Sequence, residues 1–166
     1  MTEQTAAWLR IGLRSQRLEL GRGEEVIGEY QVSTARLGAG EHYGSQKTPR
    51  GMHVIRARIG DGLPIGAVLV GRRPTGEVWT PQLMRCHPDR DWILSRILWL
   101  SGTEVGRNRL GRVDSMRRYI YIHGTPDTEP MGEAASHGCI RMRNEDVVDL
   151  FDRVAVGTPV NILEDV

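Results

Sequence analysis

The chain has 166 residues, and its 22 basic and 21 acidic side chains leave a formal net charge close to zero. This balance gives no electrostatic reason to expect a nucleic acid or an anionic membrane surface as a partner. The two cysteines are too few for a disulfide framework. The length fits a single domain over residues 1–166, with a core over about residues 9–163.

The N-terminal stretch lacks the basic and apolar segments of a secretory signal, because Glu3 and Arg10 interrupt it. The longest apolar run, at about residues 65–70, is much shorter than the roughly 18 residues that a membrane-spanning helix needs. We therefore expect a cytoplasmic protein without membrane association, or a periplasmic one if a leader has been removed.

Alternation of apolar and polar side chains, the period of a β-strand, recurs in the first half of the chain. It predicts strands over residues 8–20, 26–32, 52–59, 67–70 and 78–79. Residues 21–24 carry a turn signal that joins the first two strands as a hairpin. The glycines of residues 34–51 indicate a long loop.

Residues 86–90 are polar and indicate a loop, whereas residues 91–100 are apolar. The apolar stretch fits a buried strand or a short helix, and its Trp, Ile and Leu content favours the strand. Residues 102–114 are rich in Gly and Arg and predict a surface loop. Residues 117–123 predict a further strand with Tyr119, Tyr121 and His123 on one face.

A helix is predicted over residues 145–154, with Asn144 as its N-cap. Its apolar stripe at helical spacing is Val147, Leu150, Phe151 and Val154. Gly157 and Pro159 end the helix, and residues 160–163 predict a closing strand. The sum is a mostly β protein, or β-rich α+β fold, with one main helix.

The residues that carry chemistry lie in the segment 136–142, whose sequence is SHGCIRM. A free cysteine is mostly a thiol at neutral pH, and a nearby imidazole activates it by taking the proton. Gly138 suits a tight turn that presents Cys139, and backbone N–H groups in such a turn stabilise an oxyanion. The segment therefore predicts a cysteine acyl-transfer site, although Cys139 alone would equally fit a small buried residue.

Two histidines compete for the role of base. His137 is close to Cys139, and neighbouring side chains diverge, so it is better suited to positioning the loop or to assisting by hydrogen bonding. His123 arrives at the end of a separate strand and is the better candidate, although a histidine at a strand end is often only structural.

Other chemistries have weaker signals. Cys86 with His87 lies in a loop without a glycine turn, so it is the weaker candidate for a reactive thiol. The five histidines include His42 and His53, and no spacing matches a zinc motif, so no metal is expected. The glycines before Thr48 lack the lysine of a phosphate loop, so no cofactor is expected.

Residues 123–125 and 136–142, followed by Asp146 and Leu150, resemble the L,D-transpeptidase (YkuD) catalytic domain family. Further similarities lie at residues 32–34, 48–55 and 157–160, so that the resemblance spans about residues 9–163. Some members have Asn where this chain has Arg141. The insertion at residues 102–114 matches no feature that we can assign.

The resemblance implies a YkuD-like β-sandwich or barrel with its main helix after the cysteine loop. It also implies a cysteine that attacks peptidoglycan stem peptides between the L-centre of the third residue and D-Ala. Cys139 would be the nucleophile and His123 the base, oriented by the Gly124 carbonyl. The oxyanion would be bound by N–H groups around His137, Gly138 and Cys139.

Two further residues have proposed roles. Arg141 lies two positions after the nucleophile and is suited to bind a substrate carboxylate, the alternative being a structural arginine. Ser136 is suited to hydrogen bonding within the loop, either as part of substrate binding or as a purely structural residue.

The acceptor decides the activity, because water gives an L,D-carboxypeptidase and an amine gives a transpeptidase. Without a leader, we expect a carboxypeptidase that trims soluble tetrapeptide muropeptides during murein recycling. The alternatives are an L,D-transpeptidase, a non-catalytic muropeptide-binding module and a zinc peptidase. Carbapenems should acylate Cys139, because their carbonyl mimics the acyl donor. The oligomeric state is left open.

Overall fold

The computed structural model describes residues 6–164. The strands are β1 (Ala7–Gly12), β2 (Arg17–Arg22), β3 (Glu25–Gln31), β4 (Gly51–Ile59), β5 (Ala67–Val70), β6 (Arg73–Val78), β7 (Ile93–Gly102), β8 (Tyr121–Gly124), β9 (Ile140–Met142) and β10 (Pro159–Leu163). The helices are α1 (Pro81–Cys86), the short 3-10 helix η1 (Gly111–Val113) and α2 (Asn144–Arg153).

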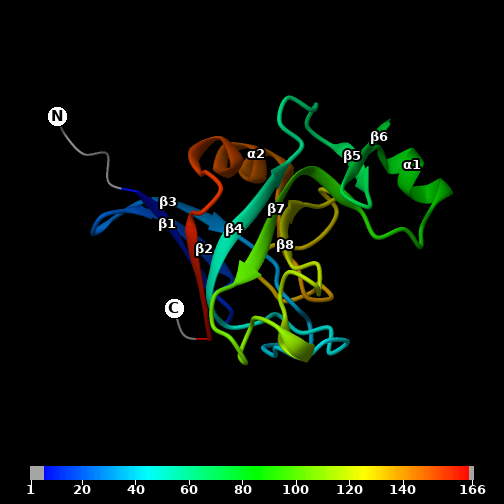
Figure 1. The fold of residues 1–166 in the computed structure, drawn as a ribbon. Helices are drawn as coiled ribbons and strands as arrows, with labels where there is room; N and C mark the ends of the chain where they lie inside the picture. Colours follow the sequence, from blue (N-terminus) through cyan, green and yellow to red (C-terminus); the bar gives the residue numbers. More distant parts are fainter. Residues whose placement is uncertain (1–5, 165–166) are drawn as a thin grey trace.

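The strands form one sheet in the order β3-β2-β1-β10-β4-β7-β5-β6, and β8 joins it by pairing with β7 and β9 (Figure 1). The pairs β1–β10 and β8–β9 are parallel, and the other pairs are antiparallel. The mostly β architecture with one main helix is therefore confirmed. The apolar segment before residue 100 is a strand, as expected.

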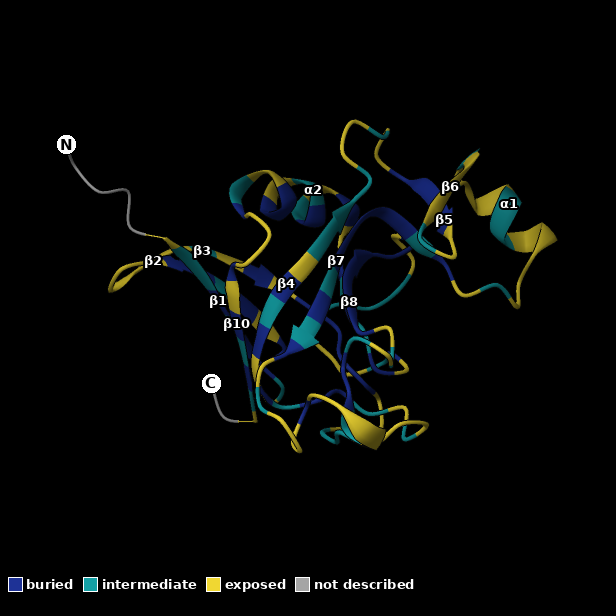
Figure 2. Ribbon diagram, in the orientation of Figure 1, coloured by how far each residue is buried: buried dark blue, intermediate teal, exposed yellow. Residues whose placement is uncertain are grey.

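The main core lies between the sheet and α2, whose inner side chains Val147, Leu150 and Phe151 are fully buried (Figure 2). Burying one such side chain stabilises the fold by about 1.5–3 kcal/mol. The helix contacts β7 and β8. Because β8 carries His123 and Gly124, this packing fixes the strand on which the candidate base lies.

The predicted strand over residues 8–20 is wrong, because a turn at residues 13–16 divides it into β1 and β2. Gln16 adopts a left-handed φ of 54° that reverses the chain. Its buried side-chain amide donates to the Leu13 carbonyl at 2.6 Å and to Thr34 Oγ1 at 2.7 Å. These bonds satisfy the amide inside the fold, which a pattern of apolar residues does not reveal.

The predicted strand over residues 117–123 is also too long, since β8 begins at Tyr121. The preceding residues form turns, and Tyr119 has a φ of 55°. Its N–H donates to the Met116 carbonyl at 3.1 Å. Tyr119 therefore does not continue the strand face that carries Tyr121 and His123.

Both α-helices differ from the sequence prediction. Helix α1 was not predicted, although Thr80 caps it by accepting the Leu83 N–H at 3.0 Å and Pro81 occupies its first turn. In α2 the N-cap is Arg143, and Asn144 is the first helical residue. The buried side chain of Asn144 bonds instead to Ser95 and to the Thr125 carbonyl.

The insertion at residues 102–114 packs against the start of β4. Asn108 is fully buried and its Nδ2 donates to the carbonyls of Arg50 and Met52, both at 3.0 Å. None of the described residues of this insertion lines the cavities around Cys139. It therefore supports the sheet rather than covering the cleft.

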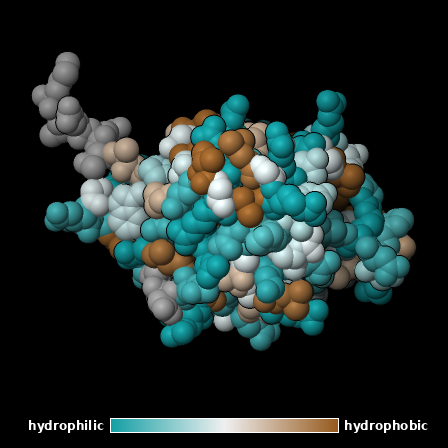
Figure 3. Space-filling model, turned by 60° about the horizontal axis from the view of Figure 1, so that its bottom comes forward, coloured by the Kyte–Doolittle hydropathy of each residue, from teal (hydrophilic) through white to brown (hydrophobic). Residues whose placement is uncertain are grey.

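The face of the molecule drawn in Figure 3 is largely hydrophilic, and its hydrophobic residues occur in small groups separated by hydrophilic ones. Exposed apolar side chains such as Val70 and Val105 belong to different segments. Within residues 6–164, no helix has the length and apolar character needed to cross a membrane.

Candidate active site

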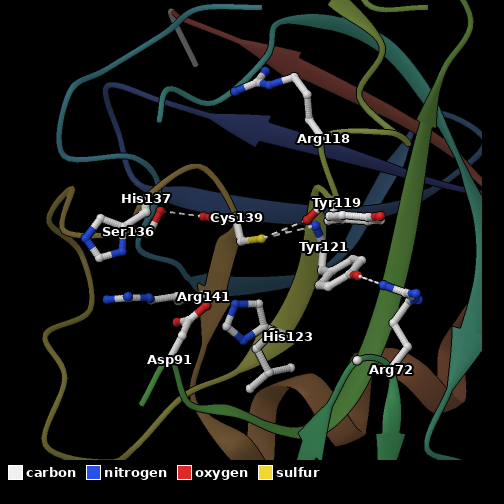
Figure 4. A pocket seen from close by; sticks show the side chains of 12 residues that line it. Arg72, Asp91, Arg118, Tyr119, Tyr121, His123, Ser136, His137, Cys139 and Arg141 are labelled. Atoms are coloured by element: carbon white, nitrogen blue, oxygen red, sulfur yellow. Dashed lines mark hydrogen bonds between the residues drawn. The ribbon is translucent and has the colours of Figure 1, made fainter. Parts of the chain in front are cut away.

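Cys139 lies where two cavities meet, with volumes of about 350 and 260 Å³. The larger cavity is also lined by Arg72, Asp91, His123 and Arg141 (Figure 4). The smaller one is lined by loop residues that include Tyr43, Gln46 and Arg117. A substrate thus has room on both sides of the sulfur.

The cysteine loop is held by two hydroxyl groups. Ser136 Oγ donates to the Cys139 carbonyl at 2.6 Å and accepts the Gly138 N–H at 3.2 Å. Thr48 Oγ1 donates to the Gly138 carbonyl at 2.9 Å. Gly138 has a φ of 136°, a conformation that favours glycine. These contacts fix the direction in which the loop presents Cys139.

The thiol of Cys139 is oriented by the backbone that precedes and begins β8. Its Sγ donates to the Tyr119 carbonyl at 3.3 Å and accepts the Tyr121 N–H at 3.4 Å (Figure 4). The left-handed turn at Tyr119 ends beside the thiol, so the local strain of about 1–3 kcal/mol lies next to the sulfur. In this state the thiol proton is directed to Tyr119 and not to His123.

Burial raises the pKa of Cys139 to about 11, an effect that the Tyr121 N–H bond opposes. Asp91 also raises this pKa, whereas Arg141 and Arg118 lower it. The resting cysteine is therefore a neutral thiol near pH 7. A base must remove its proton before the sulfur can act as a nucleophile.

His123 is buried at the centre of β8, between β7 and β9. Its Nδ1 lies 2.6 Å from the Gly124 carbonyl, and because a carbonyl only accepts, Nδ1 carries the proton and Nε2 the lone pair. Burial lowers the pKa of His123, so the ring is neutral and able to accept a proton. The parallel register places His123 opposite Arg141, next to the cysteine loop.

Gly124 has no room for a side chain. A Cβ there would lie 2.5 Å from both the Leu94 carbonyl oxygen and Asn144 Oδ1. The same Asn144 accepts the Ser95 hydroxyl at 2.6 Å and donates to the Thr125 carbonyl at 2.9 Å. This buried network joins α2, β7 and the end of β8, and it holds the carbonyl that contacts His123.

Arg141 lines the larger cavity with a side chain that is only 12% exposed. Its Nη1 lies 3.7 Å from the Glu129 carboxylate and 3.4 Å from the Ala135 carbonyl. His137 is exposed, and in Figure 4 its imidazole points away from the sulfur. The structure therefore brings Cys139, His123 and Arg141 to one cavity, and His137 also lines this cavity without its ring pointing to the sulfur.

Three charged residues of the cavity are not identified by the sequence patterns. Arg72 donates to the Tyr121 hydroxyl at 3.0 Å and lies over the Trp99 ring. Arg118 is half-buried, and its guanidinium donates to the carbonyls of Gly40, Glu41 and Lys47 and to Ser45 Oγ. Asp91 lies just before β7. No local pattern marks these residues, because the fold brings them together from separate loops.

The other candidates lie elsewhere. Cys86 is exposed on α1 and does not line either cavity at Cys139. His53 is buried between the Gly51 carbonyl and Ser115 Oγ. Within residues 6–164, no group of three or more His, Cys, Asp and Glu side chains is arranged to hold a metal ion.

Comparison with known proteins matches residues 6–162 to the family model of the L,D-transpeptidase catalytic domain, YkuD. The putative L,D-transpeptidase YqjB of Bacillus subtilis (strain 168) is 52% identical over 48 residues, which are 29% of this chain and 27% of that protein.

Two solved structures are similar in fold. L,D-transpeptidase 3 from Mycobacterium tuberculosis, with a faropenem-derived adduct, has a TM-score of 0.57 and 17% identity over 96% of this chain and 60% of its own. LdtMt1 in complex with imipenem has a TM-score of 0.55 and 17% identity over 95% of this chain and 58% of its own. These matches confirm the YkuD-like β-rich fold.

The similar region is less than two thirds of the length of each of these three proteins. The family match itself extends over nearly the whole of this chain. The chain therefore belongs to the L,D-transpeptidase catalytic domain family.

Proposed function

We propose that this chain is a cysteine peptidase of peptidoglycan stem peptides that acts as an L,D-carboxypeptidase. It would cleave the bond between the L-centre of the third residue and D-Ala through a thioester on Cys139. The observation that carries the proposal is the position of a neutral thiol and a neutral, carbonyl-bound His123 in one cavity. Family membership supports the same chemistry.

In the first half-reaction the thiol turns from the Tyr119 carbonyl and gives its proton to Nε2 of His123. The sulfur attacks the substrate carbonyl carbon, and the C=O π electrons move to the oxygen. Collapse breaks the C–N bond, and the leaving amine takes the proton from His123. In the second half, His123 takes a proton from water, the hydroxide attacks the thioester carbon, and the sulfur leaves and is reprotonated.

The Gly124 carbonyl keeps His123 in the tautomer that this scheme needs. The backbone N–H groups of the loop formed by His137, Gly138 and Cys139 would bind the oxyanion. The Gly138 N–H already donates to Ser136 Oγ, at a long 3.2 Å, so it must exchange that partner to contribute. Removing one oxyanion donor costs about 2.7–4 kcal/mol in other enzymes.

Arg141 would bind the terminal carboxylate of the substrate. Its side chain borders the cavity beside Cys139, and its contacts to Glu129 and Ala135 are long enough to be replaced by a bidentate carboxylate. Ser136 would act by holding the loop, as its two hydrogen bonds support.

A second candidate is an L,D-transpeptidase, which passes the acyl group to an amine. The smaller cavity supports it, because it meets Cys139 from the other side and offers space for an acceptor peptide. A cytoplasmic setting, with muropeptides from wall turnover as substrates, belongs to the carboxypeptidase proposal and is tested by cell fractionation.

Product analysis on a soluble tetrapeptide muropeptide separates these functions. Wild type and Cys139→Ala are compared with and without an amine acceptor. Tripeptide and free D-Ala from wild type only, unchanged by the acceptor, support the carboxypeptidase. Dimeric products would replace it with the transpeptidase. Absence of any product would favour a non-catalytic binding module.

A further inference from the structure

Asp91 is the one acidic side chain among the described residues that line the larger cavity, which three arginines also line. It is exposed, and within residues 6–164 it has no hydrogen-bond or ion-pair partner. Asp91 therefore shares the cavity with guanidinium groups, which bind carboxylates well, without forming an ion pair with any of them.

The arginines are held by other groups. Arg141 contacts Glu129 and the Ala135 carbonyl. Arg72 is bound to the Tyr121 hydroxyl and stacked on aromatic rings, and the Arg118 guanidinium is occupied by the loop at residues 40–47. Asp91 is therefore not part of a structural ion pair, and its carboxylate is open to a cationic ligand in the cavity.

Asp91 and Arg141 lie on the same side of the reacting groups. Both act electrostatically on His123 and on Cys139, in opposite directions. Figure 4 draws the Asp91 carboxylate between Arg141 and the His123 ring, whereas Arg118 lies on the far side of the sulfur. A small ligand that contacts both charges would therefore lie next to the thiol.

We propose that Asp91 and Arg141 form a subsite for a free amino acid, with its ammonium group on Asp91 and its carboxylate on Arg141. The inference rests on the proposed function and names the occupant of that site. The occupant has two sources: the D-amino acid released by cleavage, and a D-amino acid that enters as acceptor.

The charges of the reacting nitrogen explain the need for Asp91. In the peptide this nitrogen is an uncharged amide. When the C–N bond breaks, it takes one proton from His123 and a second from water, and the resulting ammonium pairs with Asp91. When an amino acid acts as the acceptor, its ammonium first loses one proton to water. The nitrogen then attacks the thioester carbon and gives a second proton to His123. The sulfur leaves and is reprotonated by His123. Asp91 thus favours the free amino acid over the peptide.

The test compares Asp91→Asn, which keeps the size and removes the charge, with wild type and with Asp61→Asn. Asp61 is exposed in the turn after β4 and lines none of the cavities that contain Cys139 or Asp91. One readout is inhibition of tripeptide formation by D-alanine and by propionate, which lacks the ammonium, and it reports binding of the leaving group. The other readout is exchange of isotope-labelled D-alanine into the tetrapeptide, and it reports binding of the acceptor.

We expect Asp91→Asn to weaken D-alanine inhibition and raise the KM for exchange about tenfold, with less than about a twofold change for propionate. Equal losses for both ligands, equal losses in Asp61→Asn, or a wild type insensitive to D-alanine would overturn the subsite. D-alanine binding is also followed by NMR titration, which needs no turnover. A wild-type protein that forms no tripeptide but binds D-alanine through Asp91 would refute the proposed function and support the subsite. A wild-type protein that does not bind D-alanine would refute the subsite.

Discussion

Replacing Gly124 with alanine perturbs the contact on which the candidate base depends. The added Cβ would lie 2.5 Å from the Leu94 carbonyl oxygen and from Asn144 Oδ1. Neither neighbour yields easily, because Leu94 O belongs to the backbone of β7 and Asn144 is fixed by its bonds to Ser95 and Thr125. The end of β8 must therefore move, and the 2.6 Å bond between His123 and the Gly124 carbonyl moves with it.

Overpacking of this kind costs about 1–3 kcal/mol, and each kcal/mol lowers the Tm of a chain of this size by about 2–4 °C. Displacing a catalytic group by about 1 Å lowers the rate about 100-fold. We therefore expect a Tm that falls by about 2–12 °C, measured by calorimetry, and a kcat/KM for tripeptide formation that falls about 100-fold.

Gly28→Ala is the matched control. It lies in β3, and its Cβ would meet the Arg153 guanidinium, which moves easily. We expect nearly unchanged Tm and activity in this variant. A Gly124→Ala protein with the Tm and activity of wild type would refute the steric argument and the role of the Gly124 carbonyl.

Burial lowers the folded-state pKa of His53 to about 4, so the unfolded chain binds the extra proton, and the free energy of unfolding falls by about 3 kcal/mol as the pH drops from about 6.5 towards 4. Burial of His123 acts in the same direction. Urea unfolding of His53→Gln should therefore show a shallower dependence of stability on pH, and a dependence equal to that of wild type would contradict this prediction. Because the pKa of Cys139 is about 11, iodoacetamide should modify it slowly at pH 7, and the rate should rise about tenfold for each unit of pH increase. Peptide mass mapping follows this rate, with exposed Cys86 as the reference. Equal rates for Cys139 and Cys86 at pH 7 would exclude the raised pKa of Cys139. Arg141→Ala should raise the KM about tenfold for a substrate that ends in a carboxylate and much less for its amidated analogue. Arg143→Ala is the control. Equal effects of Arg141→Ala on both substrates would show that Arg141 does not bind the substrate carboxylate.

Local patterns predicted most of the strands and the main helix, and they failed where side chains satisfy the backbone of a turn. The turn at Gln16 depends on hydrogen bonds to Leu13 and to the distant Thr34. The end of the predicted strand at Tyr119 depends on a left-handed residue with an ordinary side chain. The cap at Thr80 and Pro81 was present in the sequence and could have identified α1.

The candidate site was predictable where its residues are consecutive, as in the cysteine loop. Asp91, Arg72 and Arg118 come from three separate segments and enter the cavity only through the pairing of β7, β5 and β8. The bond between Asn144 and Thr125 that supports Gly124 likewise joins the start of α2 to the residue after β8. Such contacts between distant segments require the fold itself.

The central claim is that Cys139 forms an acyl-enzyme, and intact mass measurement after incubation with a carbapenem tests it most directly. We predict one adduct of the carbapenem's mass on wild type, located at Cys139 by peptide mapping and absent from Cys139→Ala. A wild type without an adduct, under conditions that modify an established member of the family, or an adduct that persists in Cys139→Ala, would contradict the account.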